Sequence, residues 1–147
     1  MKMERIMVPV DFSSYGDAAI AFASTLAKES GATLDLVHVY EEPFAYTDES
    51  STVPPADLGD DRTRLEAVRP DDPEVSFQHE FLIGHPADKI VEYAGDRQVD
   101  LIVMATHGRT GLARLLMGSV TESVLRRAPC PTLTVRMPAS QSSSNTE

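Results

Sequence analysis

The segment ATHGRTGLARLLMGS (105–119) has the residue types and spacing of an anion-binding site. Gly108, Gly111 and Gly118 interrupt a stretch that is otherwise rich in leucine, arginine and methionine. Glycine in regular structure costs backbone entropy, so such a cluster indicates a tight turn or a close approach to a ligand. Backbone N–H groups in the glycine turn, together with those that open a helix at Gly118–Ser119, favour a negatively charged group. Arg109 and Arg114 add positive charge nearby.

The same residues also admit interpretations that need no ligand. Ser119 and Glu122 have the spacing of a capping box, in which the two side chains satisfy N–H groups of the first helical turn. Asp11, at the end of an apolar run, is equally suited to capping a helix and to contacting a ligand. His107 has no serine, cysteine or carboxylate partner marked in the sequence, and the remaining histidines are scattered. The sequence therefore predicts neither catalytic residues nor metal ligands.

Apolar runs and helical periodicity alternate along the chain, which indicates which elements position this segment. Strands are expected at 5–10, 33–40, 75–83, 100–105 and 131–137. Helices are expected from Ser13 or Ser14 to Gly31, over 61–68, from Pro86, and after Gly118, with a long loop over 41–60. The first helix has the apolar stripe Ala19, Phe22, Ala23, Leu26 and Ala27, and the last has Val120, Val124, Leu125 and Ala128.

This alternation predicts an α/β fold: a single doubly wound domain whose five-stranded parallel sheet has helices on both faces. Ligands of such sheets bind at the carboxyl ends of the strands, where the winding reverses. That rule directs attention to the residues after strands 5–10 and 100–105. The strand 75–83 alternates between apolar and polar residues and is expected at an edge of the sheet.

Composition limits the range of functions. The chain has 147 residues, 41% of them hydrophobic, and a formal net charge of −10. We expect one domain over 1–137 and a disordered tail over 138–147. The negative charge disfavours nucleic acid and anionic membranes, and no apolar run approaches the roughly 18 residues of a membrane span. A single cysteine and the absence of a signal-peptide pattern indicate a cytoplasmic protein.

From Arg5 to Met137 the chain resembles a universal stress protein. The resemblance is carried by PVDFS (9–13), LVHV (36–39) and the glycine segment. In the nucleotide-binding branch of that family, a glycine, two residues, a second glycine, nine residues and then Gly-Ser or Gly-Thr follow the fourth strand. Gly108, the nine residues 109–117 and Gly118–Ser119 match the second part of the motif, and Ala105 replaces its first glycine.

The resemblance implies an adenine nucleotide alpha hydrolase-like fold with an ATP site at the switch point of the sheet. Asp11 and Val39 would frame the adenine and ribose, with Met104 and Ala105 beneath them. The phosphates would be held by Gly108, Gly118, Ser119, Val120 and Thr121, and Pro9 and Arg109 complete the predicted binding set.

The function expected from these observations is an ATP-binding, homodimeric stress-response regulator with an unidentified protein partner. The resemblance implies that the dimer forms through an antiparallel contact of the last strand, Pro131 to Met137, which is an uncharged edge up to Arg136. One alternative is a slow ATP hydrolase that uses Mg²⁺ or Mn²⁺ on the phosphates. Another is a scaffold that has lost the nucleotide, for which Ala105 is the main argument.

Overall fold

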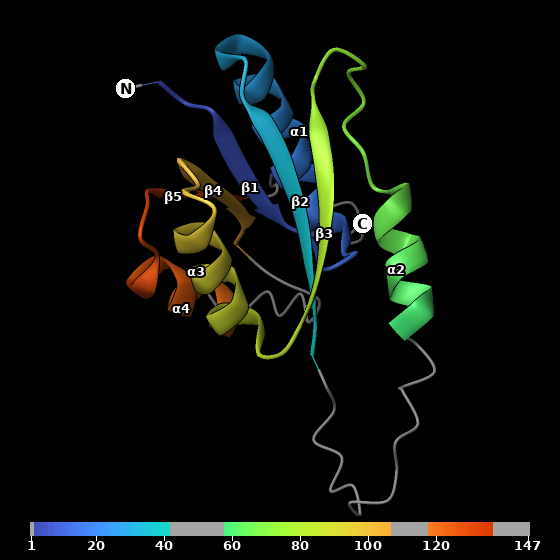
Figure 1. Ribbon diagram of the computed structural model, residues 1–147, viewed down its shortest axis with the longest axis vertical. Coiled ribbons are helices and arrows are strands. Elements are labelled where there is room, and N and C mark those ends of the chain that lie inside the picture. Colours follow the sequence, from blue (N-terminus) through green and yellow to red (C-terminus); the bar gives the residue numbers. More distant parts are fainter. Residues whose placement is uncertain (1, 42–57, 107–117, 137–147) are drawn as a thin grey trace, which may run out of the picture.

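The computed structural model describes residues 2–41, 58–106 and 118–136, and within these ranges strands and helices alternate (Figure 1). The elements are β1 (Arg5–Pro9), α1 (Ser14–Ser30), β2 (Thr33–Tyr40), α2 (Leu58–Ala67), β3 (Phe77–Ile83), α3 (Pro86–Asp96), β4 (Leu101–Ala105), α4 (Ser119–Arg127) and β5 (Thr132–Val135). The strands form one parallel sheet in the order β3-β2-β1-β4-β5. The predicted doubly wound sheet is therefore confirmed, with β3 and β5 at its edges.

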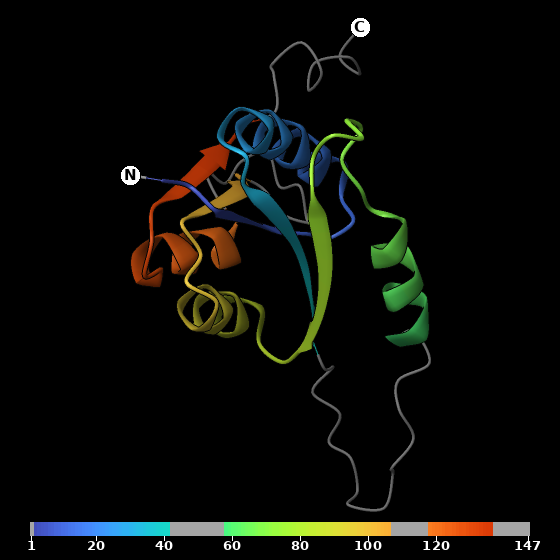
Figure 2. The ribbon, with the colours of Figure 1, turned by 45° about the horizontal axis from the view of Figure 1, so that its top comes forward.

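The helices form two layers, one on each face of the sheet (Figure 2). Alanines of α1 and Leu65 of α2 pack with Ile6 and Val8 in one core. Residues of α3 and Val124 of α4 pack with Met7 in the other. Successive β1 side chains thus enter opposite cores, which is why this strand reads as a continuous apolar run rather than an alternating one.

Two residues of the predicted helical stripes are exposed, so those assignments were wrong. Phe22 of α1 is 43% exposed, and Leu125 of α4 is 39% exposed. In α1 the buried face passes through Ile20 and small alanines, because small side chains let the helix lie close to the sheet. In α4 the hydroxyl of Thr121 donates to the Ala105 carbonyl, so Thr121 and Val124 face the sheet and Leu125 turns aside.

A buried carboxylate that the sequence did not reveal joins four elements. Asp35 of β2 is fully buried and accepts three hydrogen bonds: from Arg5 Nη1 of β1 at 2.8 Å, from Gln78 Nε2 of β3 at 2.9 Å and from the Tyr93 hydroxyl of α3 at 3.0 Å. These donors compensate for the desolvation of the carboxylate. The network therefore fixes the positions of β1, β3 and α3 around β2.

This network makes a prediction about alkaline pH. Burial, and secondarily the charge of Asp35, raises the pKa of Tyr93 from 10.0 to about 12. Between these values the folded protein keeps a proton that the unfolded chain loses, so the free energy of unfolding should decrease by about 2–3 kcal/mol as pH rises through this window. Denaturant titrations across the window should give a shallower pH slope for Tyr93→Phe than for the wild type. Equal slopes would show that Tyr93 is not responsible.

Candidate functional site

The winding of the sheet reverses between β1 and β4, which lie side by side with Ile6 paired to Leu101. The β1–β2 connection runs through α1 on one face, and the β4–β5 connection runs through α4 on the other. The carboxyl ends of β1 and β4 therefore meet at a topological switch point, where ligands bind in folds of this class. The sequence directed attention to the residues that follow these two strands.

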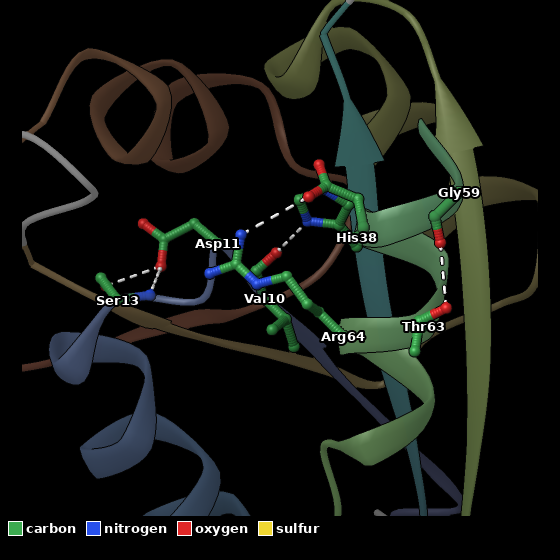
Figure 3. Close-up of polar contacts among 8 residues, drawn as sticks. Val10, Asp11, Ser13, His38, Gly59, Thr63 and Arg64 are labelled. Atoms are coloured by element: carbon green, nitrogen blue, oxygen red, sulfur yellow. Dashed lines mark hydrogen bonds and ion pairs between the residues drawn. The ribbon is translucent and has the colours of Figure 1, made fainter. Parts of the chain in front are cut away.

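Asp11 lies in the turn that follows β1. Its Oδ1 atom accepts hydrogen bonds from the backbone N–H of Ser13 at 2.9 Å and from the Ser13 hydroxyl at 2.6 Å (Figure 3). Ser13 is the N-cap residue of α1, so Asp11 orders the turn before the helix and does not cap the helix directly. Because Pro9 pairs with Val37 in the parallel register, Asp11 and Val39 both lie two residues beyond that pair.

Three apolar residues of the predicted set share one core. Met104 is buried in the core between the sheet and helices α3 and α4, and Val39 and Val120 pack partly buried against it. Ala105 ends β4, and it is not among the residues with a positive φ angle. Its methyl group therefore causes no backbone strain there. Val39, Met104 and Val120 come from β2, β4 and α4, and the fold brings them to one side of the sheet.

The start of α4 is anchored to the end of β4. The Gly118 N–H donates to the Thr106 carbonyl at 3.0 Å, and the Thr121 hydroxyl donates to the Ala105 carbonyl at 3.1 Å. Because its hydroxyl already has this partner and its side chain is buried, Thr121 would offer a ligand only its backbone N–H. The predicted helix start at Gly118–Ser119 is correct.

The capping box is not formed. Gly118 is the N-cap residue, Ser119 is already helical, and the Glu122 carboxylate pairs with Arg126 one turn further along. The cap position makes no side-chain hydrogen bond, because glycine has no side chain to offer. The N–H groups of the first turn of α4 therefore lack the side-chain acceptor that the capping box would have supplied.

Gly118 does not need to be glycine for conformational reasons. Its φ of −69° and ψ of 158° are extended values that any residue adopts. The absence of a side chain is therefore the property that glycine contributes: residue 118 places no Cβ atom beside the first turn of α4.

The remaining predicted phosphate contacts, Gly108 and Arg109, lie outside the described residues, as do Gly111, Arg114 and His107. The same holds for most of the loop expected over 41–60, of which only residues 41 and 58–60 are described, the latter already in α2. In the described ranges, no group of three histidine, cysteine or acidic residues is placed to hold a metal ion. None of the helices there is both long and apolar enough to cross a membrane.

Sequence reasoning missed the role of His38. The residue is 4% exposed, with Nδ1 2.6 Å from the Val10 carbonyl oxygen and Nε2 3.3 Å from Asp61 Oδ2. A histidine inside the apolar strand TLDLVHVY was the available signal, because a buried polar side chain must find partners. Those partners are remote in sequence and could not be named from it.

Comparison with known proteins agrees with this architecture. The Universal stress protein family model matches residues 2–136. A universal stress protein of Methanocaldococcus jannaschii is 36% identical over 141 residues, which cover 92% of this chain and 83% of the relative. Two solved structures share the fold: a universal stress protein from Archaeoglobus fulgidus in complex with dAMP (TM-score 0.68, 24% identity, 91% of this chain and 98% of that one) and a universal stress protein in complex with cAMP (TM-score 0.69, 23% identity, 92% and 98%). The chain belongs to the universal stress protein family.

Proposed function

We propose that this protein binds ATP at the carboxyl ends of β1 and β4 and acts as a dimeric regulator whose state depends on nucleotide occupancy. The observation that carries the proposal is the start of α4. An anchored helix N-terminus lies after β4 at the switch point, with glycine at its cap and no side-chain cap hydrogen bond among the residues that the structure describes. Such a terminus favours a phosphate through the N–H groups of its first turn and the helix dipole.

The chemistry of the surrounding residues suits the remaining parts of an adenine nucleotide. Val39 and Val120, which are partly buried beside the buried Met104, supply apolar surface for a base, and the Asp11 carboxylate is an acceptor for ribose hydroxyl groups. The dAMP and cAMP bound by two proteins of the same fold are both adenine nucleotides with a phosphate. ATP shares the base and differs mainly in its longer phosphate chain.

The net charge of −10 does not oppose this proposal. Hydrogen bonds to a charged group act at contact distance and contribute about 1.5–3 kcal/mol each, whereas the field of distant surface carboxylates is screened by salt. A few N–H donors at the start of α4 therefore outweigh the average charge of the surface.

Slow hydrolysis is the second candidate, with Mg²⁺ or Mn²⁺ on the phosphates. Asp11 is the carboxylate nearest in sequence to the end of β1, and its Oδ1 already accepts two hydrogen bonds from Ser13. A carboxylate held in this way is a poor general base, so we expect little turnover. Product formation with and without added Mg²⁺ separates a regulator from a hydrolase.

The identity of the nucleotide that accompanies the purified protein tests the proposal. Small molecules released by denaturing protein never exposed to added nucleotide should include an adenine nucleotide on chromatography. If no nucleotide is recovered, and the protein also fails to bind added ATP, the alternative of a scaffold that has lost nucleotide binding is favoured.

The proposed dimer forms through the open edge of β5, and the backbone directions there define a test. The Pro131 carbonyl accepts a bond from Ile102 of β4, and the Val135 carbonyl accepts one from Thr106, the residue after β4. The alternating residues Thr132 and Thr134 therefore direct their backbone groups toward the open edge. Proline at 134 would remove an outward N–H and leave the β4–β5 ladder intact.

Thr134→Pro should therefore be monomeric in light scattering at concentrations where the wild type is dimeric. Thr134→Ala, which keeps the N–H, is the matched control and should remain a dimer. A folded Thr134→Pro dimer would place the interface elsewhere on the protein.

A further inference from the structure

His38 contacts the residues on both sides of Asp11. Its Nδ1 lies 2.6 Å from the Val10 carbonyl oxygen, and since a carbonyl can only accept, Nδ1 donates this hydrogen bond. Its ring lies 4.3 Å, centroid to centroid, from the ring of Phe12, tilted by 34°. One buried side chain of β2 thus holds the backbone before Asp11 and the side chain after it.

Helix α2 supports this arrangement from the opposite side. Asp61 Oδ2 lies 3.3 Å from His38 Nε2, and Asp61 Oδ1 lies 3.5 Å from Arg64 Nη1. The Arg64 guanidinium also covers the Phe12 ring, with its Cζ 4.3 Å from the ring centroid. Figure 3 shows Arg64 reaching from α2 toward the turn that contains Val10 and Asp11. Both α2 residues therefore act on the neighbours of Asp11.

The turn has a conformation that needs such support. Phe12 has a φ of 66°, in the left-handed region that a bulky side chain adopts only at an energetic penalty. A strained residue of this kind persists only where surrounding contacts hold it, and strain of this kind is concentrated at ligand sites and switch regions. For Phe12 these contacts are the His38 ring and Arg64.

We infer that His38 is a positioning residue for the nucleotide site: with Asp61 orienting its ring, it holds the strained turn that sets the direction of the Asp11 carboxylate. The inference rests on the proposed function for its ligand. His38 links the turn 9–13 to α2. A displacement of α2 would therefore alter the site without any contact between α2 and the nucleotide. His38 itself lies on the α1–α2 side of the sheet, as its Phe12 and Phe81 contacts indicate, whereas Val39 packs on the other side.

The test compares His38→Gln with Leu34→Ala. The glutamine amide can still reach Asp61 but loses both the bond to Val10 and the ring contact with Phe12. Leu34 is fully buried in β2 and pairs with Ile6, five residues before Asp11. Its truncation therefore destabilises the fold but leaves the contacts of His38, Asp61 and Arg64 in place. Calorimetric titration with ATP, melting curves and amide hydrogen exchange are measured on both variants and on the wild type.

We expect His38→Gln to weaken ATP binding at least tenfold and, without nucleotide, to accelerate exchange of the Ser13 amide, whose acceptor is Asp11 Oδ1. Leu34→Ala should melt at a lower temperature than His38→Gln and yet bind ATP within threefold of the wild type. His38→Asn, whose amide can replace Nδ1 as the donor to Val10, should bind more tightly than His38→Gln.

Equal affinity of wild type and His38→Gln, or an equal loss of affinity in Leu34→Ala, would overturn the positioning role while leaving the proposed function intact. A wild type that does not bind ATP would overturn both. The exchange rate of the Ser13 amide distinguishes these results, because it reports on the turn whether or not the nucleotide binds.

Discussion

Gly118→Val is expected to lose ATP binding by at least 100-fold, corresponding to about 2.7 kcal/mol of binding free energy. The backbone of Gly118 has ordinary extended angles, so valine can adopt them. Its side chain, however, would stand in front of the N–H groups of α4, where we propose that the phosphates bind. The folded state should lose only about 1 kcal/mol, as is typical for an apolar residue at an N-cap.

Gly59→Val is the matched control for this prediction. Gly59 lies in α2, a Cβ atom added there would have no heavy atom within 4 Å, and its φ is not positive. The same substitution should therefore leave ATP affinity unchanged within about twofold. Calorimetric titration measures both affinities, and melting curves establish that both variants are folded. If Gly118→Val binds ATP as the wild type does, the phosphates do not lie at the start of α4.

Asp35→Ala should reduce the free energy of unfolding by about 3–5 kcal/mol, the range for removing one partner of a buried charge pair. The change leaves Arg5, Gln78 and Tyr93 without the acceptor that they share. It also removes the link that holds β1, β3 and α3 to β2. The unfolding transition should therefore become less cooperative, and its midpoint should move to a lower urea concentration. Equilibrium unfolding in urea measures both properties.

The control for Asp35 is a partly exposed acidic residue that also has a cationic partner. Asp72 lies 2.8 Å from Lys28 Nζ at the surface, and its pKa is lowered by that partner. Solvent screens such pairs, so Asp72→Ala should change stability far less than Asp35→Ala. Similar losses in the two variants would show that the burial of Asp35 carries no special weight.

The fold could be predicted from local patterns because buried parallel strands leave a strong signal. RIMVPV and DLIVMA are continuous apolar runs, and both form central strands. The helical stripes were less reliable: a helix with small apolar residues on several sides fits more than one stripe, and the buried face is decided by tertiary contacts. Phe22 and Leu125 were assigned to the core for this reason and are exposed.

The candidate site was predictable only in part. The positions of Asp11 and Val39 at the strand ends and of Gly118 at the start of α4 follow from the element pattern and the family motif. The capping box failed because spacing alone does not determine which residue begins the helix. The contacts of His38 and Asp35 join residues 23 to 58 positions apart, and no local pattern encodes such pairs.

Titration of ATP into wild-type protein stripped of nucleotide tests the central claim most directly. We expect one binding site per chain with a dissociation constant in the micromolar range, which corresponds to about −8 kcal/mol. The melting temperature should rise with ATP concentration, as it does for any ligand that binds only the folded state. Folded, nucleotide-free protein that shows no binding of ATP in the presence of Mg²⁺ would contradict the account.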